Sequence, residues 1–122
     1  MADAPRICVL LVDDHDDTLA ALRRLLTYNG YTVHAAHRAD EAVRLAAENK
    51  CDLLISDVGL PAQDGLELMR QLKRQYGLRG IAVSGYAAES DVSAALAAGF
   101  DRHLAKPVEL AKLMSAIKEL VG

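Results

Sequence analysis

Short apolar segments alternate with longer segments of helical period along the whole chain, and this alternation limits the fold more than any other feature of the sequence. Segments 6–12, 52–57 and 80–84 carry apolar residues at successive positions, which is typical of strands covered on both faces. Segment 31–36 alternates apolar and polar side chains more regularly, as an edge strand does. The predicted strands are Arg6–Val12, Tyr31–Ala36, Asp52–Asp57, Gly80–Ser84 and, with the weakest pattern, Arg102–Ala105.

The segments between these strands repeat their apolar residues at helical spacing. In segment 17–28 leucines form one stripe, and Asn29-Gly30 follows as a stop signal. The predicted helices are Asp17–Tyr28, Ala39–Asn49, Gly65–Tyr76, Ser90–Ala98 and Glu109–Val121.

The last two helices differ in the apolar face that the pattern predicts. In the small-residue helix 90–98 we expect Val92, Ala95 and Leu96 to face inward. The helix 109–121 has the cleanest stripe, which consists of Leu110, Leu113, Met114, Ile117 and Val121.

A β-α unit repeated five times predicts parallel strands, with right-handed crossovers that wind helices onto both faces of the sheet. The predicted class is an open α/β sandwich, and periodicity leaves its strand order open. A chain of 122 residues has the usual size of one domain and can bury roughly two-thirds of its unfolded surface. Because no linker, repeat or low-complexity stretch interrupts the pattern, residues 1–122 are predicted to form a single domain.

Composition narrows the classes of function. Hydrophobic residues make up 52% of the chain and charged residues 25%, as in globular rather than disordered proteins. The net charge is −3 and no basic run occurs, which argues against nucleic-acid binding by this domain. The start, MADAPR, lacks the apolar core of a signal peptide, and no apolar run approaches the ~20 residues of a membrane span. We therefore expect a cytoplasmic domain without membrane contact.

The chain has two cysteines, Cys8 and Cys51, each in or beside an apolar run. We expect them to be reduced and buried, as small hydrophobic residues, rather than to form a disulfide or serve as a nucleophile.

Polar residues follow four of the predicted strands, where each strand ends: Asp13 and Asp14, Asp57, Ser84, and Lys106. In an open parallel sheet, ligands bind outside the carboxyl ends of the strands, so these side chains should converge on one edge. Three neighbouring carboxylates do not all ionise unless a cation balances them. Because the ligands are oxygens and no His-Cys cluster offers a zinc site, the sequence favours Mg²⁺. A lysine beside such an ion can bind phosphoryl oxygens while a carboxylate attacks the phosphorus in line.

The stretch LLVDDHDD, residues 10–17, divides after Asp14. Asp16 and Asp17 need no metal, because acids at a helix start can cap free N–H groups and meet the positive end of the helix dipole. His15 and His34 are expected to be surface or edge residues rather than ligands.

Together, four motifs resemble the receiver domains of two-component response regulators, in order and spacing, from Arg6 to Val121. The motifs are LLVDDHDD (10–17), DLLISDVGLPAQDG (52–65), AVSGYA (82–87) and HLAKPV (103–108). The fold that this resemblance implies is flavodoxin-like, a (βα)5 three-layer sandwich with strand order 2-1-3-4-5.

The resemblance also implies roles for individual residues. Asp57 is similar to the phosphoacceptor, which takes a phosphoryl group from a phosphohistidine on a histidine kinase or a histidine phosphotransfer domain. Asp13 and Asp14 resemble the acidic pair that holds Mg²⁺, for which Mn²⁺ can substitute, with Asp57 and the backbone carbonyl of Gly59 as further ligands. In addition, Lys106 is expected to pair with the phosphoryl group before a cis Lys106–Pro107 bond, and Ser84 and His103 hold the positions of the conformational switch.

Two positions depart from the family's usual pattern. The switch position normally carries Tyr or Phe, and His103 there predicts a weakened or pH-sensitive switch. Gly59 leaves the acyl phosphate without a shielding side chain on that side, and Tyr86 can cover the site instead. Both positions are expected to tune the phosphoryl lifetime, in a direction that the sequence leaves open. Leu60 replaces the commoner Met before Pro61, with little expected consequence.

The leading interpretation is a signalling module that catalyses its own acyl phosphorylation and its loss, not an enzyme with outside substrates. The resemblance places its signalling face on the fourth helix, fifth strand and fifth helix. One alternative is a flavodoxin-like domain that binds a flavin or nucleotide, although the acids repel phosphates and no GxGxxG or GxxxxGK[ST] motif occurs. Another is an aspartyl-phosphate phosphatase, although Asp57-Val58-Gly59 is not a DxD motif. The parent protein is expected to be either a single-domain regulator or a hybrid sensor histidine kinase that carries this receiver at its carboxyl end.

Overall fold

Five parallel strands form one sheet within the described part of the chain. The computed structural model describes residues 6–59, 65–85 and 88–122. The strands are β1 (Cys8–Val12), β2 (Thr32–Ala36), β3 (Leu53–Asp57), β4 (Arg79–Ser84) and β5 (Arg102–Ala105), in the order β2-β1-β3-β4-β5. The predicted α/β class is confirmed, and the observed order is the flavodoxin-like one that the resemblance implies.

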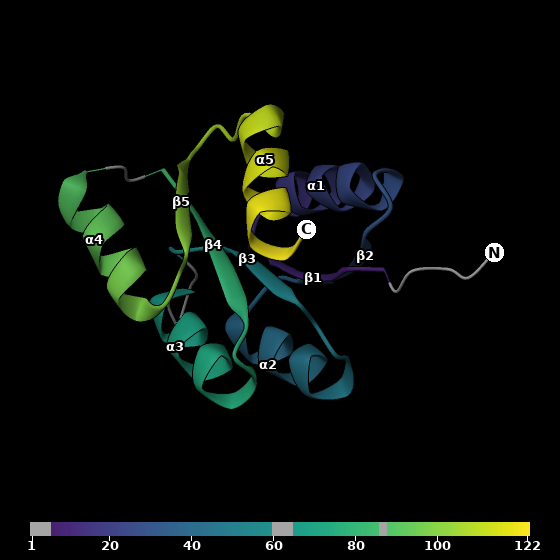
Figure 1. Cartoon of the computed structure of the whole chain (residues 1–122), viewed down its shortest axis with the longest axis horizontal. Helices are drawn as coiled ribbons and strands as arrows, with labels where there is room; N and C mark the ends of the chain where they lie inside the picture. Colours follow the sequence, from purple (N-terminus) through teal and green to yellow (C-terminus); the bar gives the residue numbers. More distant parts are fainter. Residues whose placement is uncertain (1–5, 60–64, 86–87) are drawn as a thin grey trace.

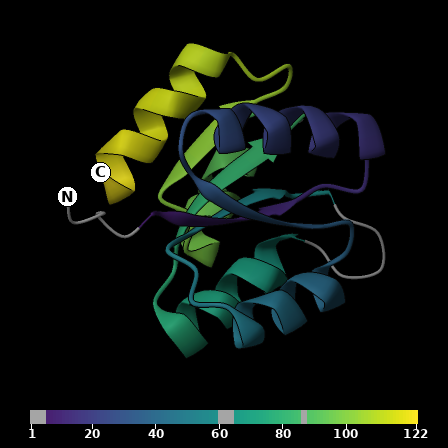
Figure 2. The ribbon, with the colours of Figure 1, turned by 90° about the vertical axis from the view of Figure 1, so that its right-hand side faces the viewer.

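Helices cover both faces of this sheet (Figures 1 and 2). α1 (Asp16–Tyr28) and α5 (Leu110–Val121) pack on one face. The other face carries α2 (Ala39–Glu48), α3 (Gly65–Tyr76) and α4 (Glu89–Ala98). Figure 2 shows the resulting sandwich, with α1 and α5 above the sheet and α2 and α3 below it. The winding reverses between β1 and β3, which places the switch point of the sheet beside the end of β1.

The central strands feed two separate cores, which explains why their residues are apolar at successive positions. All five residues of β1 are buried. Val9 and Leu11 belong to the core under α1 and α5, whereas Leu10 and Val12 belong to the core under α2, α3 and α4. β2 and β5 are the edges of the sheet and have more exposed residues, as the alternating pattern of 31–36 predicts for β2.

Two leucines that were predicted to face the core are exposed instead. Leu96 on α4 is 48% exposed, because α4 packs through Ala95 and Ala98, and a leucine one position beyond Ala95 falls off this narrow stripe. Leu110, the first residue of α5, is 42% exposed, since the buried face of α5 begins one turn later at Leu113. The strand and helix bounds otherwise agree with the prediction to within two residues.

The two cysteines lie side by side at the amino-terminal edge of the sheet. Cys8 is buried, Cys51 is half-buried, both are free thiols, and their Sγ atoms are 3.5 Å apart. Burial raises the pKa of the Cys8 thiol, and burial together with the hydrogen bond to Cys8 raises the pKa of Cys51 to about 12. Cys8 is buried as expected, whereas Cys51 is less buried than expected. No helix in the described ranges is long and apolar enough to cross a membrane.

Candidate functional site

The carboxyl ends of the strands bring the predicted site residues together at the switch point of the sheet. The register pairs Val12 of β1 with Ser56 of β3, so Asp13 and Asp57, which come next, lie side by side. On the other flank of β3 the register leads to Ser84 at the end of β4. Residues placed far apart in the sequence thus meet because parallel strands end at the same edge.

An ammonium group lies between two buried carboxylates at this edge. Asp13 is 3% exposed and Asp57 is 7% exposed. The Nζ atom of Lys106 lies 3.0 Å from Oδ2 of Asp57 and 3.4 Å from Oδ2 of Asp13. Burial opposes the charge on Lys106, but hydrogen bonding to Asp57 and the charges of Asp13 and Asp57 outweigh it and raise the pKa of this amine. The site therefore holds the amine of Lys106, with its pKa raised, against a carboxylate that little water reaches.

The backbone positions both the lysine and the acid. The Lys106–Pro107 peptide bond is cis, as the resemblance implies, and the Lys106 amide donates to the carbonyl of Ser84. Beyond β3, the Gly59 amide donates a hydrogen bond of 3.0 Å to Oδ1 of Asp57. The two carboxylate oxygens of Asp57 thus have different partners, an amide on one and an ammonium on the other.

Gly65, where α3 begins, is needed for the backbone to pass close behind Asp57. A Cβ atom at Gly65 would lie 2.5 Å from the carbonyl oxygen of Asp57 and 2.9 Å from the Cα of Val58. The Gly65 amide also donates to the Val58 carbonyl. The helix predicted to begin at Gly65 does begin there.

His15 belongs to the acidic cluster, although the sequence pattern predicted only a surface residue there. Its Nδ1 atom lies 3.0 Å from Oδ1 of Asp13 and 3.2 Å from Oδ1 of Asp14. The His15 side chain is 65% exposed, so the expectation of a surface residue holds, but its ring is turned toward the acids. Its position directly after Asp13-Asp14 was the available signal.

Asp16 and Asp17 begin α1 without capping it. The N-cap residue is His15, and it makes no side-chain hydrogen bond to the helix. Both acids lie in the first turn, where the positive end of the helix dipole favours them, so this part of the expectation agrees with the structure and the capping part is wrong. Asp16 also pairs with His37 through a contact of 2.8 Å between Oδ1 and Nε2.

A divalent cation fits the donor set at this edge. Asp13, Asp14, His15 and Asp57 each offer one ligand atom, and these four atoms all lie within 4.8 Å of one another. Three of the four are carboxylates, which are the ligands that hard divalent ions prefer. Gly59, whose carbonyl the resemblance adds to this set, lies two residues beyond Asp57, the last residue of β3.

The predicted switch positions lie on neighbouring strands. Ser84 is buried at the end of β4, and β5 carries His103 opposite Ala82. The Nε2 atom of His103 is buried and has no hydrogen-bond partner among the described residues. Tyr86 and Leu60, at which the sequence departs from the family's pattern, lie outside the described residues.

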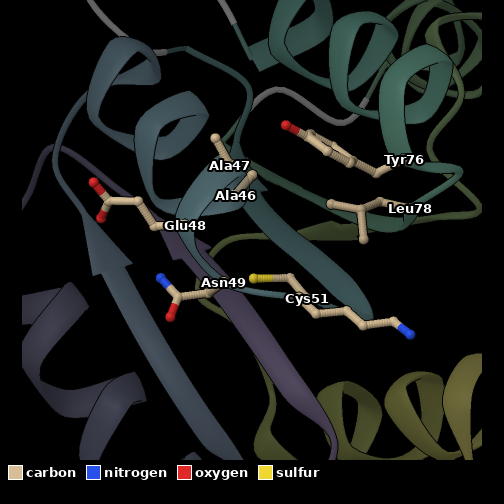
Figure 3. A pocket seen from close by; sticks show the side chains of 8 residues that line it. Ala46, Ala47, Glu48, Asn49, Cys51, Tyr76 and Leu78 are labelled. Atoms are coloured by element: carbon tan, nitrogen blue, oxygen red, sulfur yellow. The ribbon is translucent and has the colours of Figure 1, made fainter.

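A cavity of about 330 Å³ opens at the amino ends of the strands, opposite the end that carries Asp57 (Figure 3). It lies between the ends of α2 and α3, and its lining includes Ala46, Cys51, Tyr76 and Leu78. Cys51 and Leu78 precede β3 and β4, so this cavity faces the amino ends of the strands. Since ligands of open parallel sheets bind at the carboxyl ends, the chemistry belongs to the edge that carries Asp57.

A family model described as "Response regulator receiver domain" matches residues 9–118. The chain belongs to this family. Among curated relatives of this receiver, an uncharacterized 14.6 kDa protein of Leptolyngbya boryana is 40% identical over 114 residues, which cover 91% of this chain and 87% of the relative. Response regulator MprA of Mycobacterium ulcerans is 38% identical over 93% of this chain and 49% of its own length. The receiver thus spans about half the length of the MprA relatives it matches.

Solved receiver structures superpose closely on this chain. The signal receiver domain of an HD domain-containing protein from Pseudomonas fluorescens has a TM-score of 0.90 at 32% identity, covering 96% of this chain and 95% of that one. A Burkholderia pseudomallei response regulator, solved with a phosphorylated aspartic acid, a calcium ion and citrate, gives 0.84 at 32% identity over 90% of this chain and 65% of that one. The Saccharomyces cerevisiae receiver domain of Ssk1, solved with the histidine phosphotransfer protein Ypd1, gives 0.86 at 28% identity over 95% and 89%.

Proposed function

We propose that this receiver accepts a phosphoryl group on Asp57 from a phosphohistidine of a partner protein. The observation that carries the proposal is the enclosed ion pair between Asp57 and Lys106, whose Oδ2 and Nζ atoms are 3.0 Å apart. A buried carboxylate is a competent nucleophile when a fixed cation lies where negative charge develops on the transferred group.

In the proposed transfer, an Asp57 oxygen forms a bond to phosphorus while the bond from phosphorus to the imidazole nitrogen of the donor breaks. The donor ring takes up a proton and leaves as neutral histidine. Lys106 exchanges its contact with the Asp57 carboxylate for one with the phosphoryl oxygens, so its charge stays balanced. Ser84 is buried within the same edge and supplies a hydroxyl for the same oxygens.

The metal proposed for this pocket is Mg²⁺, with Mn²⁺ as a substitute. Asp13, Asp14, Asp57 and the carbonyl of Gly59 would hold it, which agrees with the clustering of the carboxylate oxygens. When bound, the ion supplies positive charge that neutralises the phosphoryl group during transfer. The response regulator from Burkholderia pseudomallei was solved with both a phosphorylated aspartic acid and a calcium ion, which supports a divalent ion as part of the proposal.

A groove beside Lys106 supports docking of the phosphohistidine donor. It has a volume of about 620 Å³, and its lining includes Ala21 and Leu22 of α1 together with Pro107 and Val108. An apolar groove next to the reactive edge suits the helix of a histidine phosphotransfer domain or histidine kinase. The complex between the Ssk1 receiver and the phosphotransfer protein Ypd1 supports a partner of this class.

The proposed output of phosphorylation is a change on the face formed by α4, β5 and α5. Leu96 and Leu110 are exposed on this face, and His103 lies between them in the sequence on β5. The buried Nε2 atom of His103 has no hydrogen-bond partner in the part of the chain that the structure describes, and an unpaired buried nitrogen costs free energy, so His103 gains little from its present position. This supports movement of the His103 ring when Ser84 turns toward the phosphoryl group.

We propose a hybrid sensor histidine kinase as the parent protein, because the motifs GFDRHLAKPV and SDVGLPAQDGLEL most resemble the receivers that such kinases carry at their carboxyl ends.

Phosphorylation with a small-molecule donor tests the proposal directly. Incubation with acetyl phosphate and MgCl2, followed by intact mass measurement, should show a gain of one phosphoryl group. The gain should vanish in Asp57→Asn and persist in the control Asp16→Asn, whose acid follows the Asp13-Asp14 pair in the sequence and pairs with His37. A wild-type chain that gains no mass while folded and supplied with Mg²⁺ would overturn the proposal.

A further inference from the structure

His15 adds a nitrogen ligand to a pocket that otherwise offers only oxygen. The backbone fixes this arrangement, because the His15 amide donates a 2.9 Å hydrogen bond to Oδ1 of Asp13 where the chain leaves β1 and enters α1. The same oxygen lies 3.0 Å from Nδ1 of the ring, and Oδ1 of Asp14 lies 3.2 Å from it. One imidazole nitrogen is therefore held against two carboxylates of the proposed metal site.

The spacing allows one ion to meet all four side chains. Their ligand atoms lie within 4.8 Å of one another, close to the ~4.2 Å that separates opposite ligands of one ion at ordinary bond lengths of about 2.1 Å. The ring is on the open side of the pocket, with 65% of the side chain exposed, so it can turn toward an ion without displacing core residues.

We propose that His15 is a fourth side-chain ligand of this pocket, used by divalent ions that prefer imidazole nitrogen and not by Mg²⁺. Imidazole suits Co²⁺, Ni²⁺ and Zn²⁺, whereas Mg²⁺ selects carboxylate, carbonyl and water oxygens. The proposal rests on the assignment of the pocket as the receiver's metal site. It predicts that this one residue strengthens the binding of imidazole-preferring ions at a site otherwise proposed for Mg²⁺ and Mn²⁺.

The variant His15→Asn tests whether the His15 ring binds the metal ion or only donates a hydrogen bond to the carboxylates. The amide nitrogen of asparagine occupies nearly the position of Nδ1 and still donates to the carboxylates, but it is a poor metal ligand. His37→Asn is the matched control. His37 also contacts two carboxylates, with Nε2 2.8 Å from Asp16 and Nδ1 3.6 Å from Glu41, and it is 51% exposed, yet it lies outside the cluster.

Calorimetric titration of the 122-residue chain with NiCl2 and, separately, MgCl2 measures both affinities. In His15→Asn, Ni²⁺ binding should weaken by on the order of tenfold or more, as for loss of a metal-site partner. Mg²⁺ binding should weaken by less than about threefold, because no oxygen ligand is removed. His37→Asn should leave both affinities unchanged.

NMR of the Co²⁺ complex supplies a readout that binding strength alone does not. A coordinated imidazole gives a paramagnetically shifted, exchangeable N–H signal, which should be present in the wild type and His37→Asn and absent in His15→Asn. Unchanged Ni²⁺ affinity and an unchanged Co²⁺ spectrum in His15→Asn, with Mg²⁺ binding intact, would overturn the inference and leave the proposed function standing. A wild-type chain that binds none of these ions would overturn the metal site and the inference together.

Discussion

The two carboxylate oxygens of Asp57 are each hydrogen-bonded by a different residue. Gly59 donates its amide to Oδ1 and leaves the space above it open, whereas Lys106 holds Oδ2. Substitutions at these two residues should therefore act on different properties of the molecule, one on water access to the phosphoryl group and the other on stability.

Side chains larger than hydrogen at position 59 should prolong phosphorylation. A Cβ atom at Gly59 would lie 3.8 Å from Oδ1 of Asp57, in ordinary contact, so a side chain that starts there lies beside the oxygen that carries the acyl phosphate. In the series Gly59→Ala and Gly59→Leu, the rate of phosphoryl loss should fall with size, by on the order of tenfold for leucine if it excludes the attacking water. Loss of the phosphoryl mass over time measures this rate, and equal rates across the series would contradict the shielding argument.

Removal of the ammonium group should destabilise the protein in a way that Mg²⁺ partly restores. Lys106→Met leaves the buried Asp13 and Asp57 without a balancing charge, at an expected cost of about 2 kcal/mol in the free energy of unfolding, discounted for the partly exposed lysine. Urea unfolding with and without MgCl2 should show a larger Mg²⁺ effect in the variant than in the wild type. The control Lys112→Met removes only an exposed pair with Glu109 and should change stability by less than about 0.5 kcal/mol.

At the scale of elements, the site depends on how helices meet the strand ends. α3 starts directly behind Asp57 at Gly65, and α4 packs on the sheet through alanines rather than through its leucine. At both places the helix backbone lies close to the sheet, so substitutions there should change the free energy of unfolding.

Gly65→Ala should distort the end of β3. The added methyl group would lie 2.5 Å from the Asp57 carbonyl oxygen, so strand end and helix must separate, at a cost of about 1–3 kcal/mol in stability. Phosphorylation from acetyl phosphate should slow as well, because the displaced residue is the acceptor. In Gly85→Ala the new Cβ meets no described atom within 4 Å, so thermal unfolding and phosphorylation should stay close to those of the wild type.

Truncation of leucines should separate the core of α5 from the exposed face of α4. Leu113→Ala removes a fully buried side chain and should cost about 2–5 kcal/mol of unfolding free energy. Leu96→Ala truncates a leucine that is 48% exposed and should cost well under about 1 kcal/mol. Urea denaturation of both variants tests this order, and similar losses would contradict the packing of α4 through its alanines.

Across the whole molecule, groups with raised pKa values lie at both ends of the parallel strands. The carboxyl-terminal edge carries the acids and Lys106, and the amino-terminal edge carries the thiol pair of Cys8 and Cys51. Both the lysine and the thiols have raised pKa values in the folded state.

Stability should decline in alkaline solution, beginning near pH 9. The unfolded chain releases its thiol protons near the ordinary pKa of 9.0, while folded Cys51 keeps its proton up to about 12. Between these values the folded state binds more protons, so the free energy of unfolding falls as pH rises, and Lys106 adds to the decline above its ordinary pKa of 10.5. Urea unfolding of wild type and Cys8→Ala/Cys51→Ala at several pH values should give a shallower slope for the variant between pH 9 and 10.5. Parallel slopes would contradict the thiol contribution.

Periodicity and strand-end polarity are local properties, so the β-α repeat, the strand bounds to within two residues and the acids at the ends of β1 and β3 could be predicted before the structure was known. The tertiary structure then set the orientation of His15 toward Asp13 and Asp14 and the contact of Lys106 with Asp57 across the sheet. It also decided that Leu96 faces outward, since helical spacing marks an apolar residue but not how closely a neighbouring alanine lets the helix approach. Distances between residues far apart in sequence, or across a turn, depend on register and packing, which no local pattern encodes.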